Sequence, residues 1–315
     1  MVNKKENIKH RILKFLYLAK GETVSGVKLS NALNVSRVAI WKHIKALKEN
    51  GFDVESRPKG YGLLNHDDLL LPFCFKDDTQ NKIFHFQELE TTMDKAKLLA
   101  KMSAPHLSVV IAENQAKGRG RMNRKWFSSK GGLWFTLILK PDIPPPFAYI
   151  YNFAASLSLS TSLKHLFDIK VSVKWPNDLL LEGKKLAGLL SEMETRGDMV
   201  EFINIGIGIN ANNHPQTDEP RAISLKDVLH QNVSRKLILE TFLDDFENRI
   251  QTIDRKKIIH QWKEQTSTIG SQVRIETLNN IYEGLAVDVD ETGALVIQHK
   301  TGDIKKIIYG DCFHT

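Results

Sequence analysis

The chain has 315 residues, of which 42% are apolar and 26% are charged, a composition that can bury the cores of two or three ordinary domains and excludes wholesale disorder. Its two cysteines, Cys74 and Cys312, cannot form a disulfide framework or a four-thiolate zinc site. Residues 1–62 carry 13 Lys and Arg against 5 Asp and Glu, a net charge of +8, whereas the whole chain carries 44 against 37, or +7.

The positive charge is therefore concentrated at the amino-terminal end. A compact basic module favours a polyanionic partner, because neutralised phosphates supply most of non-specific nucleic-acid affinity. A solvated, lysine-rich surface would have the same composition. The longest apolar runs, such as Leu133 to Leu139, are much shorter than the roughly 18 to 20 residues that span a bilayer. We expect a cytoplasmic protein without a membrane segment.

Three helices are predicted in the basic module. The first is amphipathic, and the second covers Ser25 to Leu33. The third begins after Ser36, a favourable N-cap residue, and ends at Gly51, which suits a left-handed C-cap. Apolar residues recur at helical spacing along this third helix, at Ile40, Ile44 and Leu47.

The segment Phe52 to Leu64 alternates around a Pro-Lys-Gly turn, which is typical of a β-hairpin. With this hairpin as a candidate wing, residues 1–64 resemble winged helix-turn-helix DNA-binding domains, the helix-turn-helix running from about Gly26 to Lys45. We expect the exposed edge of the third helix to contact DNA through Arg37, Trp41, Lys42 and Lys45. A role in protein contact is the alternative for the same three helices.

Residues 65–82 lack clean periodicity and indicate an interdomain linker. The following body, residues 83–265, begins with a predicted strand from Phe84 to Leu89 and a turn or cap at Thr91 and Thr92. A helix from Asp94 to Lys101 and a strand from Val109 to Glu113 follow. This order predicts an α/β or α+β domain.

The segment KGRGRMNRKWFSSK at 117–130 follows this second strand. Its glycines let the backbone approach a ligand, and its crowded guanidinium groups repel one another unless an anion lies among them. The loop therefore predicts a phosphate or carboxylate site, although it matches neither a P-loop nor a dinucleotide fingerprint. A solvated basic loop or an RNA-binding patch is the alternative.

Two further segments strengthen the prediction of a ligand site. KWPND at 174–178 follows a predicted strand, and a lysine with small residues comes after it at 185–188. The strand FINIGIGIN at 202–210 contains glycines, as if a flat molecule packed on it. Bulges are the alternative explanation for those glycines.

GRGR at 118–121 with Arg124 and Trp126, KWPND at 174–178, KLAG at 185–188 and GIGIN at 206–210 together resemble biotin protein ligases in order and spacing. With the winged helix-turn-helix, the chain resembles over essentially its whole length the members that also repress the biotin operon. Residues 266–315 read as short alternating strands, like the SH3-like domain that ends the family. The expected fold class is α+β: a winged helix-turn-helix, a central mixed α/β biotin/lipoate ligase-like domain and a C-terminal SH3-like small β-barrel.

The resemblance implies an ATP-dependent ligase that makes biotinyl-5′-AMP from biotin and ATP with Mg²⁺. It also implies transfer of the biotin to a lysine of a biotin carboxyl carrier protein, the acetyl-CoA carboxylase subunit. The same resemblance implies an adenylate-responsive repressor of biotin synthesis genes, which is a homodimer when adenylate is bound and then binds operator DNA. The loop at 117–130 is implied to close as a lid over the adenylate.

Residue roles follow from motif positions. The implied catalytic residues are Arg121 and Lys185, and Asp178 is a candidate Mg²⁺ ligand. The implied biotin-binding residues are Thr91, Thr92, Met93, Gln115, Gly118, Arg119, Gly120, Arg121, Lys185, Gly188, Gly206, Ile207 and Ile209. The implied ATP- and adenylate-binding residues are Arg121, Arg124, Lys125, Trp126, Lys185 and Asn210. Ala222 falls where some members cap adenine with an aromatic ring.

Two other functions stay open beside the RNA-binding patch. A lipoate-type ligase shares the core fold and the adenylate chemistry, and GRGR, KWPND and the C-terminal strands argue against it. A winged-helix repressor that senses a ligand without catalysis is disfavoured by the presence of Arg121 and Lys185.

Overall fold

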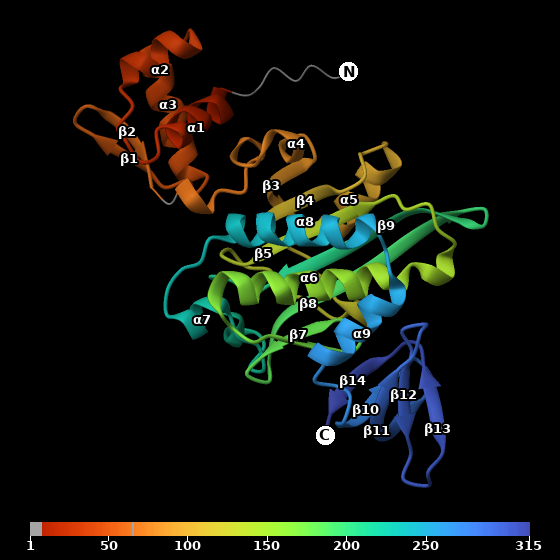
Figure 1. Cartoon of the computed structure of the whole chain (residues 1–315). Coiled ribbons are helices and arrows are strands. Elements are labelled where there is room, and N and C mark those ends of the chain that lie inside the picture. The colour runs from red at the N-terminus through yellow and green to blue at the C-terminus, as the bar shows by residue number, and fades with distance from the viewer. Residues whose placement is uncertain (1–7, 65) are drawn as a thin grey trace. The chain divides into compact units, whose positions relative to one another are not determined.

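The computed structural model describes residues 8–64 and 66–315, and the chain divides into two compact units, Met1–Gln80 and Asn81–Thr315 (Figure 1). In the first unit, the helices α1 (Ile8–Leu18), α2 (Gly26–Leu33) and α3 (Arg37–Glu49) precede an antiparallel hairpin of β1 (Val54–Arg57) and β2 (Gly60–Leu63). The predicted helix-turn-helix and wing are therefore both present.

The ends of α3 follow the predicted local chemistry. The Ser36 hydroxyl accepts a hydrogen bond from the Ala39 backbone N–H at 3.1 Å. Gly51 has φ +83°, the left-handed conformation that glycine adopts without strain. Ile40, Ile44 and Leu47 are buried, so one face of the helix packs on the unit and the other remains free.

The segment predicted as a linker is folded. It contains the short helices η1 (His66–Asp68), η2 (Pro72–Cys74) and α4 (Asp77–Gln80), and it belongs to the first unit. The Tyr17 ring of α1 contacts Phe73 edge-on, and its hydroxyl donates to the Cys74 carbonyl. Leu70 and Leu71 are buried, which the irregular spacing of the segment did not indicate.

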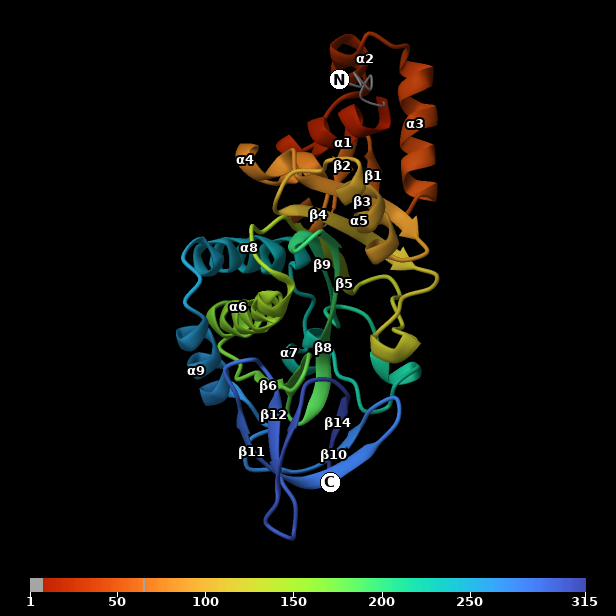
Figure 2. The same ribbon diagram turned by 90° about the vertical axis from the view of Figure 1, so that its right-hand side faces the viewer.

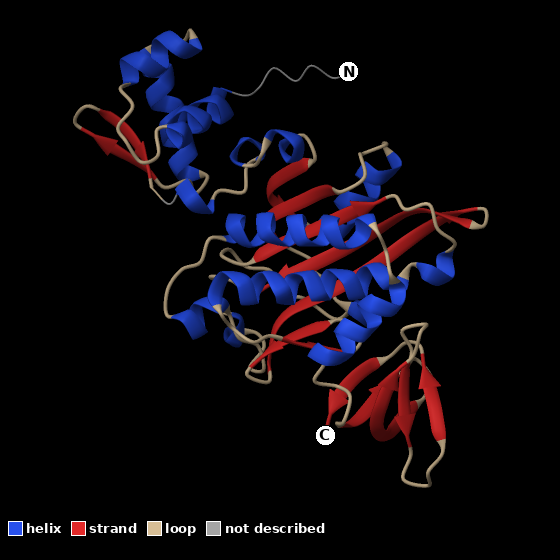
Figure 3. Ribbon diagram, viewed as in Figure 1, coloured by secondary structure: helices blue, strands red, loops and turns tan. Residues whose placement is uncertain are grey.

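The second unit is built on a seven-stranded sheet in the order β3-β4-β5-β9-β8-β7-β6, in which β3 and β4 are parallel and the other neighbours are antiparallel (Figure 3). The strands are β3 (Ile83–Leu89), β4 (Ser108–Gln115), β5 (Leu133–Leu139), β6 (Ser172–Lys174), β7 (Asp178–Leu181), β8 (Lys184–Arg196) and β9 (Met199–Ile209). The helices are α5 (Thr92–Lys101), α6 (Tyr149–Phe167), α7 (Leu225–Leu229), α8 (Arg235–Gln251) and α9 (Arg255–Gln265), with short turns η3 (Arg121–Asn123), η4 (Pro145–Phe147) and η5 (Pro215–Thr217).

Helices cover both faces of this sheet, and the alternation along β9 assigns each face. Phe135 pairs with Ile207, and its ring packs on Phe242 of α8, so the isoleucine face of β9 meets α8. On the other face, Phe202 joins a cluster with Ala96 and other residues of α5. Figure 2 shows the sheet with α6 and α8 together on one side.

The chain ends in a five-stranded antiparallel sheet in the order β13-β12-β11-β10-β14, as the SH3-like prediction requires. Its strands are β10 (Gln272–Glu276), β11 (Ile281–Val289), β12 (Leu295–Gln298), β13 (Ile304–Ile307) and β14 (Asp311–His314). The Trp175 indole donates to the Gly293 carbonyl at 3.1 Å and the Tyr149 hydroxyl donates to the Glu291 carbonyl, so the 290–294 turn fastens this domain to the larger sheet. Within the two ranges described, none of the helices combines the length and the apolarity needed to cross a membrane.

Candidate active site

A cavity of about 510 Å³ opens on the face of the large sheet that carries α5. Five parts of the second unit form its walls: the start of α5, the loop after β4, the β6–β8 region, the end of β9 with the following loop, and β14. The site therefore combines the large sheet with the last strand of the C-terminal domain.

Two paired glycines form the floor of this cavity. Gly188 of β8 lies opposite Gly208 of β9, and the Trp126 ring rests on both. A Cβ atom at Gly208 would lie 2.4 Å from the Trp126 Nε1, and one at Gly188 would lie 3.1 Å from the ring. Of the two glycines that suggested a flat ligand, Gly208 thus makes room for the flat side chain of Trp126, and Gly206 makes room for Met93.

The glycine-arginine loop is itself a tight hairpin. Arg119 and Lys125 form an isolated bridge, and the Gly120 backbone N–H donates to the Arg124 carbonyl at 2.7 Å. Met122, at the tip, has φ +50°. The hairpin directs its cationic side chains from one short segment toward several walls of the cavity.

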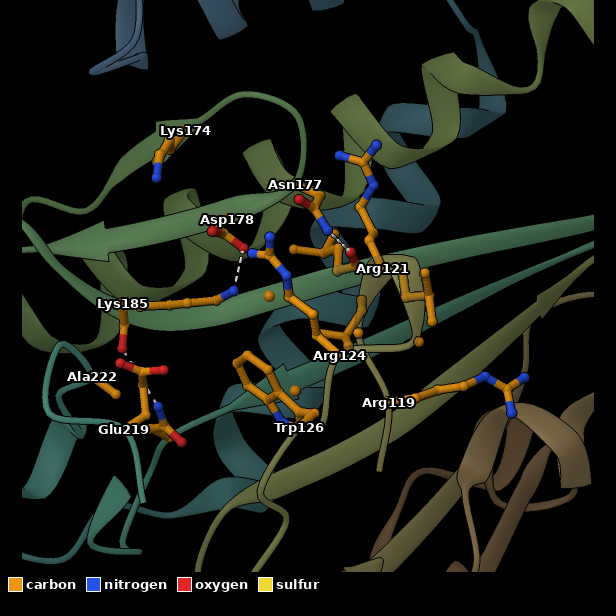
Figure 4. Close-up of a pocket in the computed structure, with 18 of the residues that line it drawn as sticks. Arg119, Arg121, Arg124, Trp126, Lys174, Asn177, Asp178, Lys185, Glu219 and Ala222 are labelled. Atoms are coloured by element: carbon orange, nitrogen blue, oxygen red, sulfur yellow. Dashed lines mark hydrogen bonds and ion pairs between the residues drawn. The ribbon is translucent and has the colours of Figure 1, made fainter. Parts of the chain in front are cut away.

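Cationic side chains from different elements lie at the cavity, and two of them, Lys185 and Arg124, pair with carboxylates (Figure 4). The Lys185 ammonium is 2.7 Å from the Asp178 carboxylate and 5.1 Å from the centre of the Trp126 ring. Arg124 pairs with Asp311 of β14 at 2.7 Å. These opposite charges hold the two cations in place.

Arg121 extends in a different direction from Lys185 (Figure 4) and donates to the Gly310 carbonyl at 2.9 Å. Burial lowers the pKa of its guanidinium, while the charges of Asp311 and Asp178 oppose that shift. An arginine remains charged in either case, so the cavity contains a partly desolvated cation. Burial also raises the pKa of the neighbouring Cys312 thiol to about 12, which keeps this thiol protonated at neutral pH.

The implied biotin-binding residues Thr91, Thr92 and Met93 lie at the start of α5, where they line the cavity. The Thr91 hydroxyl accepts from the Met93 backbone N–H, as its predicted cap role requires. Thr92 donates to the Gln115 side chain through both its backbone N–H and its hydroxyl. Arg119 points away from Lys185 (Figure 4) and pairs with Asp94 at 2.8 Å and Glu192 at 3.0 Å.

The predicted adenine end lies where β8 and β9 meet the loop after β9. Asn210 is buried, and its side-chain oxygen accepts from the Asn213 amide at 3.0 Å. Ala222 forms a bridge with Lys185 and lies on the cavity wall. The loop 211–224 contains no Phe, Tyr or Trp. Trp126 supplies an aromatic surface from another wall.

The cavity brings together most of the implied ligand residues, with two exceptions. Gly118 and Ile209 do not line it. Ile209 is fully buried, and because side chains alternate along β9, the side chains of Ile207 and Ile209 point to the α8 face, away from Gly208. Gly118 lies behind the wall, where a Cβ atom would lie 2.5 Å from the Ser128 hydroxyl.

Several cavity residues were missed by the sequence interpretation. Lys174, Glu219 and Arg221 line the cavity, as do Asp311 and Phe313 of β14. Lys174 stands in the KWPND segment, so its motif offered a signal. Asp311 and Phe313 offered no such signal, because they lie far from the other site residues in the sequence. Gly310, just before them, lies 189 positions after its partner Arg121.

Asp178 is the candidate metal ligand, and its carboxylate already pairs with Lys185. The described ranges 8–64 and 66–315 contain no cluster of three or more His, Cys, Asp or Glu suited to hold a metal ion. Mg²⁺ commonly uses one or two carboxylates together with substrate phosphates and water. Asp178 fits that limited role once a phosphate takes its place beside Lys185.

In the first unit, the four predicted DNA contacts lie on the exposed side of α3. Arg37, Trp41, Lys42 and Lys45 are all exposed, Trp41 at 55% of its surface. An indole with more than half of its surface exposed leaves a cationic and aromatic face free on this side of the helix.

Family models match three parts of the chain. Residues 84–210 match the biotin/lipoate A/B protein ligase family, residues 9–62 match an HTH domain, and residues 268–315 match the biotin protein ligase C terminal domain. These matches agree with the predicted fold class and the predicted order of domains.

Relatives match over nearly the whole chain. The bifunctional ligase/repressor BirA of Bacillus subtilis is 35% identical and covers 98% of both chains, and that of Escherichia coli is 28% identical, covering 93% of this chain and 94% of its own. Among solved structures, the biotin protein ligase from Aquifex aeolicus in complex with biotin and ATP is 26% identical. Its TM-score is 0.64, and the match covers 74% of this chain and 99% of that one.

Proposed function

Because this chain belongs to the family of biotin protein ligases that carry an amino-terminal helix-turn-helix domain, we propose that it activates biotin with ATP and transfers it to a carrier-protein lysine in the cytoplasm. The observation that carries this proposal is the single cavity in which Arg121, Arg124 and Lys185 approach from different elements. A binding site for one anion needs fewer cations than a site where two anions must react.

In the first reaction, a biotin carboxylate oxygen bonds to the α-phosphorus of ATP and pyrophosphate leaves. Both reactants are anions, so the barrier contains their repulsion and the charge that builds between them. In this proposal, Lys185 and Arg121 neutralise the carboxylate and the α-phosphate, and Arg124 with Lys125 holds the remaining phosphates. Asp178 is the residue that would hold Mg²⁺, which when bound neutralises phosphate charge.

In the second reaction, the carrier lysine amine attacks the acyl carbon of the adenylate, AMP leaves, and the amine loses a proton. The mixed anhydride also reacts with water, so the cavity has to shelter it. The hairpin at 118–126 is the proposed lid. It is anchored through Arg124 to Asp311 of β14 and through Arg121 to the preceding Gly310. Exchange of those contacts for phosphate would close the hairpin over the adenylate.

The second part of the proposal concerns DNA binding by the first unit. We propose that the exposed face of α3 binds operator DNA near biotin synthesis genes, and that adenylate favours a homodimer with two such faces. Dimers bind two half-sites, which raises affinity without new contacts to each half-site. Sedimentation with and without biotinyl-5′-adenylate tests the dimer: an unchanged mass would contradict it.

Incubation of the full chain with biotin, MgATP and a biotin carrier domain tests the ligase. We expect biotin on the carrier, detected by streptavidin, and a fall of at least about a hundredfold in rate for Arg121→Ala and for Lys185→Ala, as for loss of a charge-stabilising group. Lipoate in place of biotin should give no product. Transfer of lipoate instead would contradict the biotin assignment.

Lys263→Ala is a matched control for Lys185→Ala. Lys263 pairs with Asp288 at 2.6 Å, its side chain is 32% exposed against 34% for Lys185, and it lies outside the cavity. Its loss removes a similar ion pair and should leave the rate unchanged. Equal losses in both variants would mean that the effect is not local to the cavity.

A further inference from the structure

A chain of hydrogen bonds extends from the cavity into the interior of the second unit. The Thr136 hydroxyl of β5 donates to the Thr92 hydroxyl at 2.8 Å, which donates to the Gln115 side-chain oxygen at 3.1 Å. The Gln115 amide nitrogen donates to the Ser128 hydroxyl at 2.8 Å, and Ser128 donates to the Trp126 carbonyl at 3.2 Å. Gln115 is the central member.

The direction of every bond in this chain is fixed by one backbone donor. The Thr92 N–H points at the Gln115 side chain from 2.7 Å. Because a backbone N–H can only donate, the atom that faces it must be the amide oxygen, and the amide nitrogen must face Ser128. If the amide were rotated, its NH₂ group would face the Thr92 N–H at 2.7 Å, and both groups are donors.

This arrangement leaves one donor unused. The Gln115 nitrogen carries two hydrogens, and one goes to Ser128. Gln115 lines the cavity, and the described residues supply no acceptor for its second hydrogen. The amide therefore presents an N–H donor to the cavity and keeps its oxygen away from a ligand.

Thr136 and Ser128 do not touch the cavity. Thr136 is fully buried, Ser128 is buried, and neither side chain lines the cavity wall. Gly118 makes room for the same contacts, because a Cβ atom there would lie 2.4 Å from the Trp126 carbonyl and 3.3 Å from the Gln115 nitrogen.

We propose that Thr136 and Ser128 are positioning residues that lock the Gln115 amide with its nitrogen toward the cavity, so that the site accepts a carbonyl oxygen at the ring end of its ligand. The proposal rests on the proposed function, since biotin carries such an oxygen on its ureido ring. In this proposal a glycine is required at position 118, because a side chain there would collide with the Trp126 carbonyl and the Ser128 hydroxyl.

The test uses biotin and 2-iminobiotin as probes with the full chain. In 2-iminobiotin a cyclic guanidine replaces the urea; protonated at neutral pH, it offers only donors where biotin offers an acceptor. Wild-type protein should form adenylate from biotin and strongly disfavour the imino compound. Ser128→Ala removes the acceptor that holds the amide nitrogen in place, so the donor presented to the cavity is held less firmly. The preference for biotin should then fall about tenfold or more, the size of one lost hydrogen bond to a polar ligand.

The kinetic signature separates positioning from general damage. In Ser128→Ala, the KM for biotin should rise about tenfold, whereas the KM for ATP and the kcat at saturating biotin should change less than about threefold. Thr136→Val, which keeps the shape and removes the hydroxyl, should act in the same direction. Thr136→Ser restores the donor and should behave as wild type.

Ser162→Ala is the matched control. Its hydroxyl is also buried and donates to the Ser158 carbonyl within α6, away from the cavity. It should leave both the biotin KM and the preference between the two probes unchanged.

An unchanged preference in Ser128→Ala and Thr136→Val, with active wild-type protein, would overturn this proposal and leave the ligase function intact. An equal change in Ser162→Ala or Thr136→Ser would also overturn it, because the effect would then be structural. Wild-type protein that makes no adenylate from biotin would instead refute the proposed function.

Discussion

At the scale of single residues, the site is arranged so that its cations are held by weak partners before the reactants arrive. Lys185 faces Asp178, Arg124 faces Asp311, and both pairs reach solvent. Partly exposed pairs of this kind contribute on the order of 1 kcal/mol or less. A triphosphate with several charges can therefore displace the carboxylates at little cost.

The glycine floor gives a residue-scale prediction. Gly208→Ala places a methyl group 2.4 Å from Trp126, so the indole must move away from the floor and into the space where the adenylate would lie. We expect the rate of adenylate formation, measured by pyrophosphate release, to fall about tenfold or more.

Gly26→Ala is the control for this substitution, because its new Cβ would meet only the Tyr61 ring at an ordinary 3.6 Å. It should keep the wild-type rate. Full activity in Gly208→Ala would show that the position of Trp126 does not matter to the reaction.

Single site residues can be predicted from the sequence only where their chemical type and their spacing are both distinctive. Arg121 and Lys185 could be predicted because glycine and cations share short motifs. The partners Gly310 and Asp311 could not, since contact across 189 positions is decided by domain docking. Ile209 was placed in the site by its motif, yet strand alternation turns it to the opposite face.

At the scale of elements, the 290–294 turn decides how the C-terminal domain meets the cavity. Gly293 has φ +79°, and a Cβ atom there would lie 2.7 Å from the Tyr149 ring of α6. Gly293→Ala thus adds a steric clash to a strained backbone. The turn and β14 belong to the same C-terminal domain, and β14 lines the cavity. A shift of the turn would therefore also move residues of the cavity wall.

The C-terminal sheet contains a control for that substitution. Gly302 has φ +91°, and a Cβ atom added there would have no neighbour within 4 Å, so Gly302→Ala carries the backbone strain alone, about 1 kcal/mol. Gly293→Ala should destabilise the second unit by roughly a further 1 to 3 kcal/mol, as overpacking does. Urea unfolding measures both, and equal losses would mean that the docking contact contributes nothing.

A buried charge network joins β3, β4 and α8. Glu113 of β4 contacts His85 at 3.0 Å and Arg235 at 2.7 Å. Burial alone would raise the pKa of Glu113, but the hydrogen bond from His85 and the charge of Arg235 lower this pKa from 4.5 to about 2. A carboxylate whose pKa is lowered by folding stabilises the fold while it is ionised.

The stability that Glu113 provides is fully present above pH 4.5 and is lost as the pH falls toward 2. A shift of this size corresponds to about 3 kcal/mol. Glu113→Gln should lower the free energy of unfolding at pH 7 and flatten its decline between about pH 5 and 2, whereas Glu201→Gln, at an exposed position of β9, should do neither. A parallel decline in wild type and Glu113→Gln would exclude this network as the cause.

Elements with clear periodicity or caps could be predicted, and those with uniform burial could not. The strands from 83, 108 and 199 and the helix capped by Thr91 were predicted within a few residues. Helix α6 was not, because it is buried on nearly all sides, including Ser156, Ser158, Ser160 and Ser162, and so has no polar stripe.

At the scale of the whole molecule, the two units present their cations differently. The first unit exposes basic side chains along α3, and the second gathers cations around a cavity. If α3 contacts DNA phosphates, Lys45→Ala and Lys42→Ala should each weaken binding of the full chain to a mixed-sequence duplex. Each should also reduce the slope of log affinity against log salt by about one.

Lys263→Ala in the second unit is the control for the DNA measurement and should leave the slope unchanged. If Lys45→Ala and Lys42→Ala bind with the wild-type salt dependence, α3 is not the DNA-contacting helix. The ligase activity of these variants should stay at the wild-type level.

A crystal structure of the full chain with biotinyl-5′-adenylate bound tests the central claim most directly. We expect that the Arg121 guanidinium has left the Gly310 carbonyl and the Lys185 ammonium has left Asp178. Both should then lie within about 3.2 Å of the phosphate or acyl oxygens of the adenylate. An adenylate bound in the cavity while Arg121 and Lys185 keep their present partners would contradict the account.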